Sequence, residues 1–263
     1  PLALANPISS DLAVMRRTLL SSLLPCVQYN LNRQQNRVRL FETGLRFDGS
    51  DIASLNQVDT LAMVAVGSTH PEQHHDSRVM DFYDLKHDVQ SVLPRAVISS
   101  ISYQRSTQPF LHPGQSADIW YAGKRIGWLG QLHPQITKVL DLPTTWVAEL
   151  DLQTVIEMHQ PLVAIAAPSK FPQVRRDIAV VVAQSVEVQA MIDTIKQVGG
   201  ALLQDTWLFD VYAGSNLPEN QQSLAFALIW QDVEATLSDE RVSQQMDTVL
   251  GTLHQQFNAA LRV

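Results

Sequence analysis

The order of the hydrophobic patterns after residue 172 constrains the fold more than any other feature of the sequence. Some segments there are short and apolar or alternate apolar with smaller residues, as strands do. Others place apolar residues at every third or fourth position, as helices do. The predicted strands cover 177–182, 202–212, 223–230 and 259–263, and the predicted helices follow Ser185 and Ser238, which are placed to cap them. The order is therefore βαββαβ.

This order is that of the split βαβ, or ferredoxin-like, sandwich. Two helices cover one face of a four-stranded sheet in this architecture, and the other face remains uncovered. Tyr212 ends one of the predicted strands just before Gly214, where an aromatic ring could stack on an unpaired RNA base or simply complete the edge of the core. The uncovered face is the first candidate for a functional surface.

The chain has 263 residues, enough for about two domains at roughly 100 to 200 residues each. Prolines between Gln160 and Pro172 stop helices and interrupt strand pairing, so we interpret this stretch as a linker between domains 1–165 and 168–263. The first domain carries 13 basic and 15 acidic residues before position 166, and the second carries 6 and 11. The second domain is the more acidic one.

The first domain mixes helices and strands. A helix with apolar residues from Leu12 to Leu24 is expected to be interrupted or kinked by Pro25. Strands are predicted over 38–47 and 60–66, a helix over 81–93, and a hairpin over 117–129 that turns at Gly123-Lys124. Because most strands follow hairpin-like turns, the class is α+β, with an antiparallel sheet and helices packed on it.

Composition excludes several classes of protein. The single cysteine, Cys26, excludes an internal disulfide framework, and its apolar neighbours predict a buried thiol in a reducing compartment, the cytoplasm. No apolar run approaches the roughly 20 residues that span a bilayer, so no membrane partner is expected. A net charge of -7 by itself argues against a dedicated nucleic-acid-binding protein, although Arg175 and Arg176 form a local basic patch that could contact phosphate, and no DNA partner is expected.

Catalytic sites are weakly supported. A loop gathers His70, Glu72, His74, His75 and Asp76, residue types that could hold zinc as a metal hydrolase would, but the spacing does not make them converge. A solvated polar loop is the favoured interpretation, and no metal site is predicted. The sequence also has no Gly-x-Ser-x-Gly nucleophile motif and no Gly-rich phosphate-binding loop.

Several segments together resemble the C-terminal part of bacterial phenylalanine–tRNA ligase beta chains. They are NPISSDLAVMRR (6–17), RLFETG (39–44), DFYDLK (81–86), LHPGQSA (111–117), IGWLGQLHP (126–134), SKFPQVRRDI (169–178), FDVY (209–212), SLA (223–225) and TLSDE (236–240). The resemblance implies an inactive, class II synthetase-like core module followed by a ferredoxin-fold anticodon-binding domain. It also implies that the family's N-terminal RNA-binding, editing and magnesium-binding segments are absent, consistent with a chain that begins without Met.

The resemblance further implies a cytoplasmic heterotetramer in which an alpha subunit performs the chemistry with ATP and magnesium, while this part holds no cofactor. The residues agree, because class II folds place an Arg and a Glu two positions apart on one strand, whereas Arg39 and Glu42 are three apart. They are expected on opposite faces. The alpha-subunit interface is predicted on the first helix, at Leu12, Met15, Arg16, Leu19 and Leu23, with the helix as part of the module's own core as the alternative.

For tRNA(Phe), the resemblance implies anticodon contacts at Asp210, Tyr212 and Ser223. The predicted RNA-binding set also includes Gln222, Arg175, Arg176 and Arg262. The family usually has Lys where this chain has Gln222, and Arg at one of the places that Glu234 and Ala235 occupy, and each missing cation removes a possible phosphate contact. A regulatory domain that binds a small molecule through the ferredoxin-like unit is the alternative function.

Overall fold

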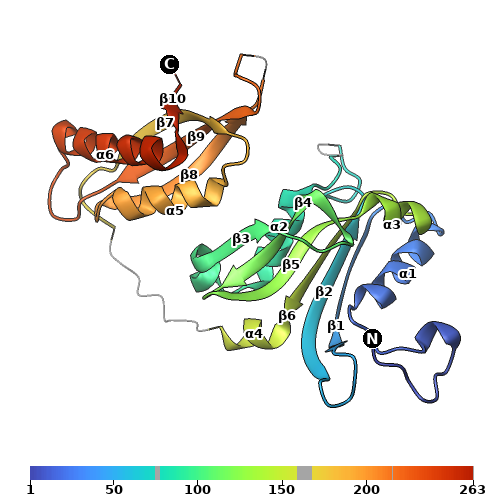
Figure 1. Cartoon of the computed structure of the whole chain (residues 1–263). Helices are drawn as coiled ribbons and strands as arrows, with labels where there is room; N and C mark the ends of the chain where they lie inside the picture. The colour runs from blue at the N-terminus through green and yellow to red at the C-terminus, as the bar shows by residue number, and fades with distance from the viewer. Residues whose placement is uncertain (75–77, 159–167, 215, 263) are drawn as a thin grey trace. The chain divides into compact units, whose positions relative to one another are not determined.

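The structure is a computed structural model that describes residues 1–74, 78–158, 168–214 and 216–262. The chain divides into two compact units, Pro1–Val163 and Ala164–Val263 (Figure 1). Most of the predicted linker, residues 159–167, lies outside the described residues. No helix in the described ranges is long and apolar enough to cross a membrane.

The first unit is built on a six-stranded antiparallel sheet with strand order β1-β2-β6-β5-β4-β3. The strands are β1 (Val38–Asp48), β2 (Asn56–Val66), β3 (Ile101–Arg105), β4 (Leu111–Tyr121), β5 (Lys124–Leu132) and β6 (Thr145–Asp151). The helices are α1 (Leu20–Leu31), α2 (Phe82–Val92), α3 (Pro134–Val139) and α4 (Leu152–Glu157), with 3-10 turns η1 (Ser10–Leu12) and η2 (Arg95–Ser100). The predicted antiparallel sheet with packed helices is confirmed.

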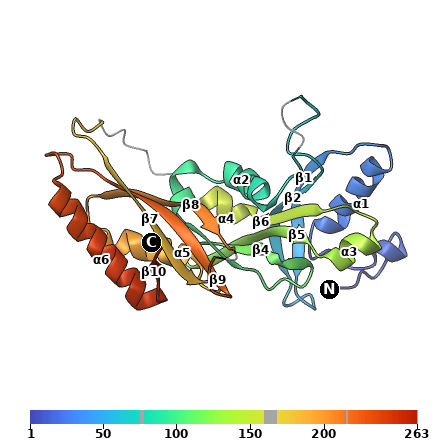
Figure 2. The same ribbon diagram turned by 90° about the horizontal axis from the view of Figure 1, so that it is seen from above.

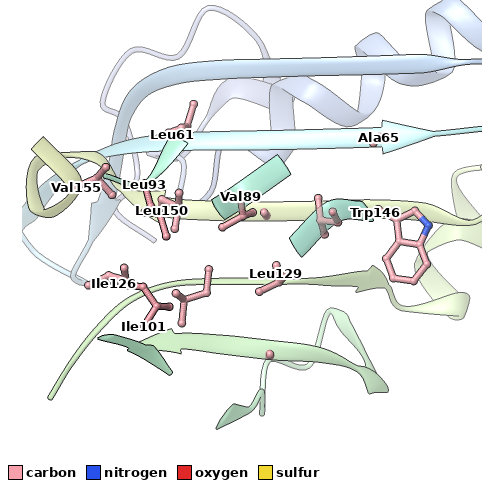
Figure 3. Packing of buried hydrophobic residues seen from close by; sticks show 14 of the residues in the cluster. Leu61, Ala65, Val89, Leu93, Ile101, Ile126, Leu129, Trp146, Leu150 and Val155 are labelled. Carbon is pink, nitrogen blue, oxygen red and sulfur yellow. The ribbon is translucent and has the colours of Figure 1, made fainter. Parts of the chain in front are cut away.

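Each face of this sheet has its own hydrophobic core. Leu61 and Ala65 of β2 belong to the same core as Val89 of α2 (Figure 3), whereas Ala62 and Val64, one position along, join the core under α1. Figure 2 shows α1 and α2 on opposite sides of β1 and β2. Because side chains alternate along a strand, one strand can supply both cores.

Two predictions for the start of this unit are wrong: where its first helix begins, and the burial of the Cys26 thiol. The helix begins at Leu20 rather than near Leu12, and Pro25 lies inside it. Pro25 removes one backbone hydrogen bond of the helix, and the buried side chains of Leu20, Leu23 and Val27 hold the helix to the sheet despite that loss. The thiol of Cys26 is exposed rather than buried, because Leu23 and Val27 define the inward face and Cys26 lies beside that face.

The second unit has a four-stranded antiparallel sheet with strand order β10-β7-β9-β8. Its elements are β7 (Val174–Ala183), α5 (Val188–Val198), β8 (Leu203–Tyr212), β9 (Gln221–Trp230), α6 (Asp239–Phe257) and β10 (Ala260–Leu261). Helices α5 and α6 lie together against the sheet (Figure 1), and their apolar residues form one core with alternate residues of β7 and β9. The predicted βαββαβ sandwich is confirmed.

The two predicted helix caps have different outcomes. Ser238 caps α6, and its side chain accepts a hydrogen bond from the Arg241 backbone N–H at 3.4 Å. Ser185 does not cap α5, since that helix begins only at Val188 and its capping position is Glu187. A backbone turn from Val186 to Ala183 occupies the expected position instead.

Candidate nucleic-acid interface

The uncovered face of the second sheet is organised in rows that run across the strands. Pairing between β7, β9 and β8 places these side chains side by side: Arg175 with Ile229 and Asp205, Asp177 with Ala227 and Trp207, Ala179 with Ala225 and Asp210, and Val181 with Ser223 and Tyr212. Small residues therefore form the floor along the middle of the face. Larger polar and aromatic side chains stand along β8, where a flat ligand could contact them.

A bulge in β8 decides which side chains share this face. Leu208 pairs with Phe226 and Asp210 with Ala225, which leaves Phe209 as an extra residue without a direct partner. Without the bulge, strict alternation would put Trp207 on the opposite face from Asp210 and Tyr212. The extra residue resets the alternation and brings all of these onto the uncovered face.

Asp210, Tyr212 and Ser223, three of the predicted RNA-binding residues, lie together. Tyr212 and Ser223 are directly paired across β8 and β9, and Asp210 is one pair further along. The Arg262 guanidinium lies 4.7 Å from the centre of the Tyr212 ring, which brings a fourth predicted residue to the same place. Ser223 is buried and Asp210 is exposed. The cluster offers an acceptor, a hydroxyl, an aromatic face and a cation.

Gly214 makes room for the Tyr212 ring. A Cβ atom added at Gly214 would lie 2.3 Å from the Tyr212 hydroxyl oxygen and 2.5 Å from its Cζ atom. Any larger residue would push the ring away, so the turn after β8 fixes where the aromatic face stands.

A second cluster on the same face was missed by the sequence analysis. The Arg175 guanidinium lies 5.5 Å from the centre of a Trp207 ring and 5.7 Å from the centre of the Phe209 ring. Asp177 holds this guanidinium through two hydrogen bonds of 2.8 and 3.1 Å to Nε and Nη2. Arg175 was predicted as an RNA contact, but the two aromatic partners depend on the bulge, which the sequence pattern does not reveal.

Two residues of the predicted RNA-binding set lie on the other face. Arg176 pairs with Asp239 at the start of α6 at 2.8 Å, on the side that the helices cover. Gln222 pairs in register with the buried Val182 and so projects toward the helices as well. Arg176 and Gln222 are each one position along the strand from the face residues Arg175 and Ser223, so alternation places them on the opposite face.

The predicted alpha-subunit interface residues fall into three groups, which are buried, half-buried and exposed. Leu19 and Leu23 are buried in the core of the first unit, as the alternative interpretation of this helix anticipated. Met15 and Arg16 are half-buried, and Arg16 pairs with Glu42 at 2.7 Å. Leu12 is exposed, as are the nearby Ile8 and Val14. Among the predicted interface residues that the structure describes, Leu12 is the apolar side chain that is exposed to a partner.

Arg39 and Glu42 lie on opposite faces of β1, as their spacing predicts. Arg39 pairs with Asp88 of α2 at 3.2 Å, whereas Glu42 binds Arg16 and the Ser22 hydroxyl on the α1 side. The α1 face also has a cavity of about 720 Å³ lined by charged residues that include Arg17, Arg46, Arg125, Glu149 and Asp151. Of the lining residues, Arg46 pairs with Asp48 within the cavity and Arg125 pairs with Asp118 outside it, so carboxylates balance much of the positive charge.

The histidine-rich loop offers no zinc site in the part of the chain that the structure describes. Among those residues, no group of three or more His, Cys, Asp or Glu side chains could hold a metal ion. His75 and Asp76, two of the five candidate ligands, lie outside the described residues.

These features define a two-module α+β protein whose second module is a ferredoxin-like sandwich with one uncovered face that carries aromatic residues. Residues 1–152 match the family model described as "Phenylalanyl tRNA synthetase beta chain CLM domain", and residues 169–262 match "Ferredoxin-fold anticodon binding domain". The chain belongs to the phenylalanine–tRNA ligase beta-chain family, which confirms the resemblance in the sequence.

Relatives agree over the full chain. It is 56% identical over 262 residues to the phenylalanine–tRNA ligase beta subunit of Psychrobacter arcticus, covering 99% of this chain and 33% of that protein. It is 53% identical over 266 residues to that of Acinetobacter baylyi, covering 100% of this chain and 33% of that protein. The chain thus spans about a third of the length of these relatives. A pyrrolysyl-tRNA synthetase structure from Desulfitobacterium hafniense has a TM-score of 0.40 and 16% identity over 54% of this chain and 48% of its own.

Proposed function

We propose that this chain docks the catalytic alpha subunit of a cytoplasmic phenylalanine–tRNA ligase and contacts the anticodon of tRNA(Phe) through the uncovered face of its second unit. The observation that carries the proposal is the meeting of Asp210, Tyr212, Ser223 and Arg262 at one place on that face. In this proposal the complete enzyme's ATP and magnesium belong to the alpha subunit, and this chain acts as a scaffold and an adaptor.

The chemistry of this cluster suits an unpaired guanine. The Asp210 carboxylate accepts hydrogen bonds from the donors on the Watson–Crick edge of guanine, and the Tyr212 ring stacks on its face. Ser223 supplies a hydroxyl that both donates and accepts. Small residues at Ala225 and Ala179 leave space for the base beside Asp210.

Arg262 covers the Tyr212 ring where a base would stack. Binding therefore exchanges a cation–π contact for a stacking contact and frees the guanidinium to reach a phosphate. In this way a single arginine can contribute to RNA binding although the overall charge of the second unit is negative. Arg262→Gln should therefore remove about one phosphate contact. We expect the slope of log affinity against log salt concentration to become shallower by about one.

The test is binding of the tRNA(Phe) anticodon stem-loop, compared with a stem-loop in which inosine replaces the anticodon guanine. Inosine lacks the exocyclic amino group that Asp210 would bind. We expect wild type to prefer guanine and Asp210→Asn to lose that preference, at a cost of about 1 to 3 kcal/mol. Tyr212→Ala should weaken both stem-loops by a similar amount, because stacking does not depend on that amino group.

Asp247→Asn provides the matched control, since Asp247 is an exposed carboxylate on α6. The proposal fails if wild type binds guanine and inosine stem-loops equally, or if Asp247→Asn changes the preference as much as Asp210→Asn. Calorimetry with free phenylalanine separates the regulatory alternative, in which the amino acid alone binds and the stem-loop does not.

A further inference from the structure

We propose that the uncovered face has a second base-stacking site, formed by Trp207, Phe209 and Arg175, for another nucleotide of the same single-stranded RNA segment. This proposal rests on the proposed function and extends it. The first site, at Tyr212, holds one anticodon base, and the second holds a base a few nucleotides away along the strand.

Trp207 and Phe209 are more exposed than is usual for large aromatic side chains. Trp207 is 37% exposed and Phe209 is 48% exposed, whereas the other four tryptophans are buried or half-buried. Both rings lie within 6 Å of the Arg175 guanidinium on a face that no helix covers. Rings and guanidinium planes of this kind are the groups on which single-stranded RNA bases stack.

The spacing of the two sites suits one RNA strand. Trp207 pairs with Ala227 and Tyr212 with Ser223, so the rows are four residues apart along β9, or about 13 Å. An unstacked RNA strand covers this distance in a few nucleotides, since even stacked bases advance by roughly 3.4 Å each. Between the rows lie only Ala225 and Ala179 on the central strands, which leave a low floor for the intervening nucleotide.

The role of Arg175 is to hold a base rather than a phosphate. Asp177 makes two hydrogen bonds to its guanidinium and neutralises much of its charge. The paired guanidinium stays planar and can still stack, and the nearby carboxylate offsets part of its attraction for a phosphate. Arg175 therefore differs from Arg262, for which a phosphate contact is proposed.

The experiment uses the full chain and the tRNA(Phe) anticodon stem-loop, and measures affinity and tryptophan fluorescence together. Stacking of a base on Trp207, the most exposed tryptophan, is expected to quench fluorescence in wild type. Trp207→Ala and Phe209→Ala should each weaken binding by roughly 5- to 150-fold, the range for loss of one stacked base. Trp207→Phe should retain most of the affinity and lose the quenching.

Two controls keep the result specific. Phe41→Ala removes an even more exposed ring from β1 of the first unit and should leave affinity unchanged. Arg175→Gln should weaken binding while leaving its salt dependence as in wild type, whereas Arg241→Gln, on α6, should change neither. Thermal unfolding of each variant establishes that the second unit remains folded.

The outcomes separate this inference from the proposed function. If Tyr212→Ala weakens binding but Trp207→Ala, Phe209→Ala and the quenching experiment show no effect, the second site is refuted and the anticodon site stands. If wild type binds no stem-loop at all, both proposals fail. If Arg175→Gln lowers the salt dependence, the arginine contacts a phosphate and its stacking role is wrong.

Discussion

At the scale of single residues, Glu149 is the most unusual side chain in the first unit. It lies on β6, a strand buried along nearly its whole length, and is only 4% exposed. Its carboxylate accepts hydrogen bonds from the Thr18 hydroxyl at 2.5 Å and from the Leu19 backbone N–H at 2.7 Å. Burial raises the pKa of this carboxyl above its ordinary value of 4.5, although these hydrogen bonds oppose the shift.

This shift predicts how stability depends on pH. A carboxyl whose folded-state pKa is raised stabilises the fold below its ordinary pKa of 4.5, and that contribution is lost as pH rises through the folded-state value. Glu149→Gln keeps an acceptor for the Leu19 N–H and cannot ionise. We therefore expect the variant to gain stability relative to wild type as pH rises from 4.5 toward neutral, measured by urea unfolding. A difference that is constant with pH would contradict this.

Gly214 gives a second prediction for a single residue. In Gly214→Ala the new Cβ atom overlaps the Tyr212 hydroxyl, so we expect the ring to move and the fold of the second unit to remain. We expect weaker binding of the anticodon stem-loop with little change in the melting temperature. Gly251→Ala is the matched control, because a Cβ atom there has no neighbour within 4 Å. In helix α6 that change should add about 0.5 to 1 kcal/mol of stability and leave RNA binding unchanged.

At the scale of secondary-structure elements, those whose pattern lies within a single segment were predicted correctly, and features that depend on contacts between segments were not. The stripes of α5 and α6 and the strands of the second sheet follow from side-chain spacing, which the sequence displays directly. The bulge at Phe209 depends on how β8 pairs with β9, so it cannot be derived from one strand alone. The same limit applies to α1, whose start is set by packing against the sheet rather than by apolar spacing between Leu12 and Leu24.

The cap of α6 is testable at this scale. Ser238→Ala removes the side chain that accepts from the Arg241 N–H, and should destabilise the second unit by about 1 kcal/mol. Ser185→Ala is the control, since Ser185 precedes a helix whose capping position is Glu187, and it should have little effect. Chemical unfolding of both variants decides the matter. An equal loss of stability in both variants would mean that the Ser238 hydroxyl does not stabilise α6 as a cap.

At the scale of the whole molecule, each unit has a complete hydrophobic core of its own. Exposed apolar side chains that remain are therefore available for partners. In the first unit Ile8 is 95% exposed and Leu12 is 59% exposed, and both belong to the N-terminal segment before α1. The sequence shows that this segment is rich in apolar residues. It does not show which of them face outward, because their burial depends on how α1 packs against the sheet.

This distinction changes how docking to the alpha subunit should be tested. Leu12→Asp together with Ile8→Asp should abolish copurification with an alpha subunit and leave the melting temperature unchanged, since both side chains are exposed. Leu19→Asp should instead unfold the first unit, at a cost of about 3 to 5 kcal/mol, because it buries a charge in the core under α1.

Ile52→Asp, at an exposed apolar site between β1 and β2, controls for the added charge. Full copurification of the Leu12 and Ile8 double variant would exclude this segment from the interface, whereas loss with Ile52→Asp as well would show that charge, not position, is responsible.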